Sequence, residues 1–150
     1  MPSRARPTAA VASLFVDSGA WIALRSRRDQ HHAAADRAFR VAIDRHIPLL
    51  TTNLVLAEVH RLTLHRVGFE AAVRALERID ASPSVSVMHA NGDDHSAARA
   101  WIDRLAPKPV TYADAVSFAV MARTGCSHVL GFDDDFIAAG FERWQAPTGD

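Results

Sequence analysis

Two aspartates of this sequence follow short apolar runs, at positions that an ordinary surface carboxylate does not need. Asp17 comes directly after Leu14-Phe15-Val16, and Asp133 comes directly after the stretch 127–132. Runs of this length are too short for helices and are typical of buried parallel strands. In an α/β sheet, such strands end at the edge where ligands bind. Asp17 and Asp133 are therefore expected at the same edge of one sheet.

A glutamate interrupts the apolar face of a predicted helix. The helix is expected over 54–67, and Glu58 lies four residues from both Leu54 and Leu62 in its apolar stripe. A glutamate in a buried stripe is costly unless its charge is compensated. The sequence leaves two explanations open: a salt bridge to an arginine such as Arg61, or a cation held in a cleft.

Asp114 stands three residues after Thr111, at the start of the most hydrophobic predicted helix. This spacing resembles a capping box with Asp in place of Glu or Gln, and a helix dipole favours an acid there, so capping alone would explain Asp114. In a parallel sheet, however, strand ends and the helix N-termini that follow them share one edge. Asp17, Asp114 and Asp133 are therefore expected to converge, with Glu58 projecting from a flanking helix.

Four carboxylates in one place predict a site for a hard divalent cation. Without a cation they repel one another and raise their own pKa values. Oxygen ligands without sulfur or nitrogen select Mg²⁺ or Mn²⁺, and such ions bridge phosphate oxygens and activate water for in-line displacement. Asp17, Glu58, Asp114 and Asp133 are the predicted metal ligands and catalytic residues.

Helices alternate with short apolar strands along the chain, which predicts a three-layer α/β/α sandwich with a mostly parallel central sheet. One domain is expected over 13–145, with flexible tails at 1–12 and 146–150. Asn53 is expected to cap the helix that follows it, and Ala34 and Ile43 are expected to face the core. Strands are predicted at 13–16, 47–52, 85–88, 127–132 and 141–144. Helices are predicted at about 20–24, 31–45, 54–67, 69–79, 94–105, 111–122 and 136–139.

Composition limits the classes of partner. The 17 basic and 17 acidic side chains balance, which excludes a wholly basic nucleic-acid coat but allows a local patch. Lys108 is the only lysine, so nearly all the positive charge is arginine, which suits phosphate recognition but also suits simple base-composition bias. Cys126 is the only cysteine, which indicates a reducing, cytoplasmic compartment. No apolar run is long enough to span a membrane.

Four ordered segments carry a resemblance to a known family. The chain resembles PIN-domain nucleases, and specifically the VapC-type toxins of bacterial toxin–antitoxin pairs, over about residues 13–144. Each segment is short, but their order along the chain is fairly specific. The matching segments are 15–20, 51–58, 111–115 and 130–136.

The resemblance implies a PIN-like fold and cleavage of single-stranded regions of RNA, leaving 5′-phosphate and 3′-hydroxyl ends. It carries over Asp17, Glu58, Asp114 and Asp133 as ligands of Mg²⁺ or Mn²⁺. It also implies a small cognate antitoxin and a homodimer.

The chain departs from the family pattern at two places. Gly131 stands where the family commonly has threonine or serine. The run of three aspartates leaves the fourth acid ambiguous: Asp133 is preferred because it follows the strand directly, Asp135 is the second candidate, and Asp134 is expected to face solvent.

Functions of other classes fit less well. A haloacid-dehalogenase-type phosphatase needs a second aspartate two residues after the first, where this chain has Gly19. A response-regulator receiver needs a lysine at the end of a late strand, and Lys108 lies in a linker between two prolines. An acid-rich metal-dependent phosphoesterase of another family, or a non-catalytic PIN-fold interaction module, stays open as an alternative. The interaction module would not need Glu58 inside an apolar stripe.

Overall fold

The computed structural model describes residues 11–148, and within them a five-stranded sheet forms the centre of the fold. The strand order is β3-β2-β1-β4-β5, and every neighbouring pair is parallel. The carboxyl ends of the strands therefore share one edge, as predicted. The strands are β1 (Leu14–Val16), β2 (Leu49–Thr52), β3 (Val85–Met88), β4 (His128–Leu130) and β5 (Glu142–Arg143).

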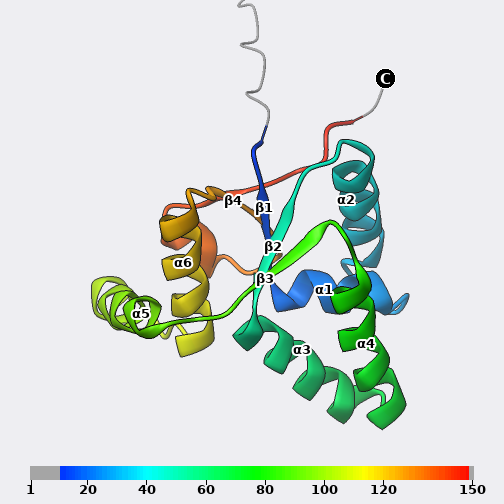
Figure 1. Cartoon of the computed structure of the whole chain (residues 1–150), viewed down its shortest axis with the longest axis horizontal. Coiled ribbons are helices and arrows are strands. Elements are labelled where there is room, and N and C mark those ends of the chain that lie inside the picture. The colour runs from blue at the N-terminus through cyan, green and yellow to red at the C-terminus, as the bar shows by residue number, and fades with distance from the viewer. Residues whose placement is uncertain (1–10, 149–150) are drawn as a thin grey trace, which may run out of the picture.

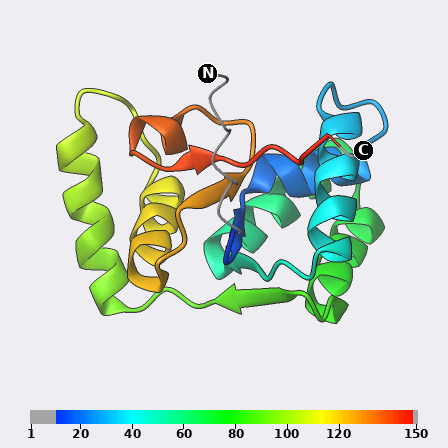
Figure 2. The same cartoon turned by 90° about the horizontal axis from the view of Figure 1, so that it is seen from above.

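Helices cover both sides of this sheet. In the two views, α5 and α6 lie on one side and α1 to α4 on the other (Figures 1 and 2). The predicted three-layer α/β/α architecture is confirmed. The helices are α1 (Ser18–Arg25), α2 (His32–Asp44), α3 (Asn53–Arg66), α4 (Phe69–Ala81), α5 (Gly92–Leu105), α6 (Tyr112–Thr124) and α7 (Asp135–Ala138).

The core lies around β1 and α6, the two elements that carry the first and third predicted acids. All three residues of β1 are fully buried, and α6 is buried continuously from Asp114 to Met121. Phe118 of α6 meets Phe136 of α7 edge-on, with ring centroids 4.9 Å apart. Burial of each such ring stabilises the fold by about 1.5–3 kcal/mol. Asp17 and Asp114 thus extend from rigid supports.

The helix α3 begins one residue earlier than predicted. Its N-cap is Thr52, whose Oγ1 accepts a hydrogen bond from the N–H of Val55 at 3.1 Å. The prediction that Asn53 caps this helix is wrong, because β2 passes into α3 without an intervening loop. The Asn53 side chain instead accepts a hydrogen bond from the N–H of Ala90, which joins α3 to the segment after β3.

The buried face of α2 is narrower than predicted. Ala35, Ala38, Phe39 and Ala42 are buried, whereas Ala34 and Ile43 are exposed, Ile43 to 49%. The prediction was wrong at these last two positions because they flank the stripe set by a period of 3.6 residues.

The predicted tails fall partly outside the described residues. Residues 1–10 and 149–150, which belong to the predicted tails 1–12 and 146–150, lie outside the range of the structure. Within the described range, Ala146 packs against the core and the carbonyl of Pro147 accepts a hydrogen bond from Arg37. Over residues 11–148, the helices are all too short or too polar to cross a membrane.

Candidate metal centre and active site

Three of the predicted acids meet at the carboxyl edge of the sheet. Asp17 directly follows β1, and Asp114 lies in the first turn of α6. Asp133 does not follow its strand directly as predicted, because β4 ends at Leu130 and two residues intervene. Each of the three acids offers one carboxylate oxygen to a group in which these atoms all lie within 4.8 Å of one another. Adjacent strands bring the first and third acids together, since the Asp17 N–H donates to the carbonyl of Leu130 at 3.2 Å.

Asp17 has the most perturbed environment of the three. Its side chain is 5% exposed, and its Oδ1 is buried without a hydrogen-bond partner among the described residues. Burial raises its pKa to about 7, and the nearby carboxylates of Asp114, Glu58 and Asp133 add to the rise. Although Asp17 is the N-cap residue of α1, its side chain makes no capping bond. The carboxylate is therefore available to a ligand.

Asp114 shares these features and also serves the helix. Its backbone N–H donates to the Thr111 Oγ1 at 3.1 Å, so Thr111 caps α6 as predicted. Burial raises the pKa of Asp114 to about 6, the carboxylate of Asp133 adds to this, and a hydrogen bond with Thr111 works in the opposite direction. The capping bond uses the backbone N–H of Asp114 and the hydroxyl of Thr111. The Asp114 carboxylate itself lies near the other acids.

Glu58 lies beside this group without belonging to its tightest part. It is half-buried on α3, and its charge is close enough to raise the pKa values of Asp17 and Asp114. Among the ion pairs of residues 11–148, none joins Glu58 to Arg61. Among residues 11–148 the predicted alternative of a salt bridge to Arg61 is therefore not formed, and Glu58 faces the group of acids only through its charge.

The three consecutive aspartates separate into three environments. Asp133 joins the group of acids, and its Oδ1 accepts a hydrogen bond from the N–H of Asp135 at 2.9 Å. Asp134 is 86% exposed and pairs with Arg143, so its expected exposure is confirmed. Asp135 pairs with Lys108 at 3.2 Å, although its charge still reaches Asp114. The geometry favours Asp133 over Asp135 as the fourth acid.

This group of acids fits a divalent cation. Three carboxylate oxygens converge, one buried oxygen lacks a partner among residues 11–148, and two pKa values are raised, chiefly by burial and further by the neighbouring carboxylates. A hard cation would offset the repulsion between the carboxylates, give the buried oxygen a partner and lower the raised pKa values. Oxygen ligands suit Mg²⁺ or Mn²⁺.

Two smaller residues, Gly131 and Thr51, lie against the backbone and side chain that position Asp17. A Cβ added at Gly131 would lie 3.2 Å from the Cβ of Asp17, so this glycine lets β4 end close against the acid. Thr51 is fully buried on β2, and its hydroxyl donates to the carbonyl of Val16 at 3.1 Å. Sequence reasoning missed Thr51 as a support of Asp17, because a threonine in a strand gives no signal of which backbone group it bonds.

Comparisons with known proteins agree with this geometry. Residues 14–142 match the PIN domain family. The curated 23S rRNA-specific endonuclease VapC20 of Mycobacterium tuberculosis, from strains CDC 1551 / Oshkosh and ATCC 25618 / H37Rv, is 37% identical over 128 residues, which are 85% of this chain and 95% of the relative. The crystal structure of M. tuberculosis VapC20, described as a sarcin–ricin loop cleaving toxin, superposes with a TM-score of 0.81 at 36% identity. It covers 89% of this chain and 99% of that one.

The chain therefore belongs to the PIN domain family. The predicted family is confirmed, and the predicted class of activity, RNA cleavage by a VapC-type nuclease, agrees with the names of these relatives.

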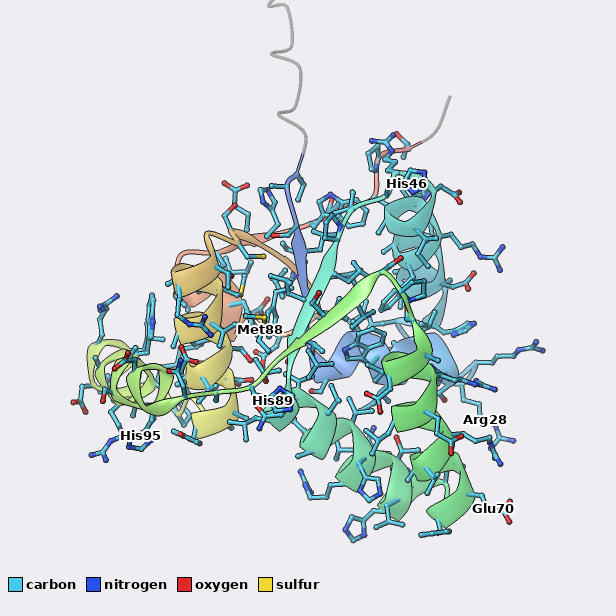
Figure 3. All side chains as sticks on the ribbon, viewed as in Figure 1. Arg28, His46, Glu70, Met88, His89 and His95 are labelled. Carbon is cyan, nitrogen blue, oxygen red and sulfur yellow. The ribbon has the colours of Figure 1, made fainter. Side chains whose placement is uncertain are left out.

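A positively charged groove lies apart from the acids. It encloses about 620 Å³ between α1, α3 and α4, over an apolar floor that includes Trp21, Val59 and Ile79. Burial lowers the pKa of Arg25, and the like charge of Arg78 lowers it further. Arg28 extends outward on this side of the molecule, where Glu70 also lies (Figure 3). The arginines that line the groove are Arg25, Arg28, Arg66, Arg74 and Arg78.

Arg25 and Arg28 line the groove, whereas Arg27 is exposed outside it. The sequence did not predict the groove because its arginines come from three helices and a loop that are distant along the chain.

Proposed function

We propose that this protein is a divalent-metal-dependent endoribonuclease that acts as the toxin of a toxin–antitoxin pair. The observation that carries the proposal is the convergence of Asp17, Asp114 and Asp133 within 4.8 Å, with an unpartnered buried oxygen on Asp17. The VapC20 relatives, named as RNA endonucleases, support the substrate class.

The four acids take distinct parts in this proposal. Asp17, Asp114 and Asp133 hold Mg²⁺ or Mn²⁺. The bound ion supplies positive charge that orients the phosphate, lowers the pKa of water and stabilises charge that develops in displacement. Glu58, which the sequence predicted as a fourth metal ligand, lies beside the group and in this proposal instead accepts a hydrogen bond from the attacking water. Water then adds to phosphorus as one of its protons passes to Glu58, the bond to the 3′-oxygen breaks, and that oxygen takes a proton from solvent, which leaves 5′-phosphate and 3′-hydroxyl ends.

The first RNA to test is suggested by the relatives. VapC20 is named for 23S rRNA and its crystal structure for the sarcin–ricin loop. We propose ribosomal RNA as the substrate of this chain also, which would place it in the cytoplasm.

The arginine-lined groove is the surface to which we propose that the antitoxin binds. An antitoxin segment with an apolar face and acidic borders would cover the exposed Val67 and the half-buried Leu62 and would neutralise Arg25 and Arg78. A homodimer is proposed from the family resemblance, and light scattering at micromolar concentration tests it.

Cleavage assays test the activity. The purified chain should cut 23S rRNA in Mg²⁺ or Mn²⁺, should stop in EDTA, and should leave ends that a 5′-phosphate-dependent exonuclease degrades. The same preparation kept in EDTA and then given Mn²⁺ serves as the control. Undiminished cleavage in EDTA, or no cleavage of any RNA, would contradict the proposal. Binding of RNA without cleavage would favour the non-catalytic module.

A further inference from the structure

We propose that a small cavity beside the acids is a nucleobase subsite, in which one base of the RNA next to the scissile phosphate packs against Phe132 and Trp144. This inference rests on the proposed RNA cleavage and adds a specificity determinant to it. The cavity encloses about 310 Å³ between α2, the turn after β4 and the segment after β5.

The cavity adjoins the acids through two residues. Gly131 lines the cavity and also packs against Asp17, since a Cβ on it would lie 3.2 Å from that of the acid. Phe132 lines the cavity and directly precedes Asp133. A strand held at the acids therefore brings its neighbouring nucleotide to the mouth of this cavity.

Phe132 is prepared for stacking. Its ring lies parallel to that of His31, with an interplanar angle of 5° and centroids 4.1 Å apart. The His31 N–H donates to the Asp29 Oδ1 at 2.8 Å, which fixes the start of α2 under the stack. Phe132 is half-buried rather than part of the closed core. A flat ring held in this way can accept a base, because every base has a π-face.

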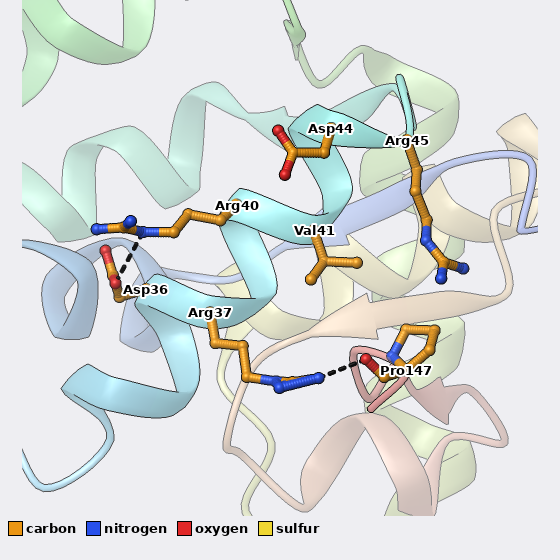
Figure 4. A pocket seen from close by; sticks show the side chains of 7 residues that line it. All are labelled: Asp36, Arg37, Arg40, Val41, Asp44, Arg45 and Pro147. Atoms are coloured by element: carbon orange, nitrogen blue, oxygen red, sulfur yellow. Dashed lines mark hydrogen bonds and ion pairs between the residues drawn. The ribbon is translucent and has the colours of Figure 1, made fainter. Parts of the chain in front are cut away.

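Two arginines supply charge for the backbone of the same nucleotide. Arg37 and Arg143 both line the cavity. Arg37 reaches the carbonyl of Pro147, and its neighbour Arg40 pairs with Asp36 (Figure 4). Among the described residues Arg37 pairs with no carboxylate.

Arg143 is also only partly used. It pairs with the exposed Asp134, while its Nε–H is buried without a partner among residues 11–148. Arg37 therefore retains its charge for a phosphate, and Arg143 could exchange the exposed Asp134 for one, which would offset the repulsion of RNA by the acids.

The cavity and the arginine-lined groove differ in size, and they therefore suit different ligands. A volume of about 310 Å³ lies at the lower end of the range for small-molecule sites, roughly 300–1,000 Å³. It suits a single ring system, whereas a helix about 10 Å across needs the wider groove between α1, α3 and α4. The occupant is thus a base rather than an antitoxin segment.

Abasic substitution tests the inference. The cut site in the RNA is first mapped, and a synthetic stem–loop around it is made with an abasic residue at each position on either side. One position should lower kcat/KM of the wild-type protein by roughly 5- to 100-fold. In Phe132→Leu the intact RNA should lose a similar factor, and the abasic substitution should then cost nothing further. Phe69→Leu, which changes an exposed phenylalanine outside the cavity, should keep the full abasic penalty.

A binding experiment in EDTA separates this inference from the activity. RNA with 2-aminopurine at the sensitive position should lose fluorescence on binding to wild-type protein and to Phe69→Leu, but not to Phe132→Leu or Trp144→Leu. Equal abasic penalties in wild type and Phe132→Leu, or a Phe132→Leu defect only in antitoxin binding, would overturn the subsite and leave the nuclease intact. Failure of the wild-type protein to cut any RNA would instead overturn the proposed function.

Discussion

The first turns of α5 and α6 share one kind of capping bond, but the carboxylates of their third residues lie in opposite electrostatic environments. Asp94 and Asp114 each lie three residues after an N-cap side chain, Asn91 or Thr111, and each donates its backbone N–H to that side chain. Both aspartates are buried, to 2% and 7% exposure. The bond to the N-cap side chain therefore does not distinguish them, although only Asp94 completes a capping box, by accepting the Asn91 N–H at Oδ2.

Their partners across the fold do distinguish them. Arg123 donates to the Asp94 carboxylate from Nε at 2.8 Å and from Nη2 at 3.1 Å, and the backbone N–H of Asn91 donates a third bond. The pKa of Asp94 is lowered, chiefly by the Arg123 hydrogen bonds, whereas burial and carboxylates raise that of Asp114 to about 6. A compensated buried acid holds two helices together, and an uncompensated one marks a ligand site.

RNA cleavage should show the largest difference between the two aspartates. Asp114→Asn keeps the size and the cap of the residue but removes a ligand charge, so kcat/KM should fall by at least about a hundredfold. Asp94→Asn should retain wild-type activity per folded molecule. Comparable losses in both variants, measured with the amount of folded protein checked by circular dichroism, would break the comparison.

Stability should change in the opposite order. Asp94→Asn weakens a bidentate pair at a helix start and should lower the free energy of unfolding by about 2 kcal/mol. Asp114→Asn removes an uncompensated charge, so in EDTA at pH 8 it should leave the stability unchanged or raise it. Urea titration of both variants beside the wild type measures the difference, and destabilisation by Asp114→Asn alone would speak against an uncompensated charge.

The pH dependence should sharpen the contrast. The folded pKa values of Asp17 and Asp114, about 7 and 6, exceed the ordinary value of 3.8, so the folded state binds more protons between pH 4 and 7. In EDTA, the free energy of unfolding should therefore fall by roughly 4–7 kcal/mol as pH rises through this window. The lowered pKa of Asp94 acts below pH 4, where its contribution is lost as pH falls.

Thermal unfolding in EDTA at a series of pH values measures this dependence. Asp17→Asn should flatten the profile between pH 4 and 7, and Asp94→Asn should leave that window unchanged. A profile that rises with pH in all three proteins would mean that the acids are compensated by something other than a metal.

Gly131 should give the smallest effect. Its substitution by serine brings a Cβ to 3.2 Å from that of Asp17 and requires a shift of a few tenths of an ångström. We expect Gly131→Ser to lower the free energy of unfolding by under about 1 kcal/mol and to change cleavage only severalfold. Complete loss of cleavage would show that the family's usual serine or threonine cannot be accommodated in this chain.

The fold could be predicted from the sequence because the patterns that indicate strands and helices are local. Apolar runs that end in Asp17 and Asp133 predicted parallel strands, and the single edge of a parallel sheet then predicted that the acids meet. Nothing in the sequence indicated the pair between Asp94 and Arg123, since the two residues lie 29 positions apart. The arginine groove and the cavity beside Phe132 were also beyond reach, because their linings come from segments that only the fold brings together.

Manganese binding tests the central claim most directly, because it needs neither RNA nor an antitoxin. Titration of Mn²⁺ into metal-free protein at pH 7.5, followed by electron paramagnetic resonance of the free ion, compares the wild type with Asp114→Asn and Asp94→Asn. The wild type and Asp94→Asn should bind with the same affinity, and Asp114→Asn should bind at least about tenfold more weakly. Equal affinity in all three proteins would contradict a metal centre at the carboxyl edge of the sheet.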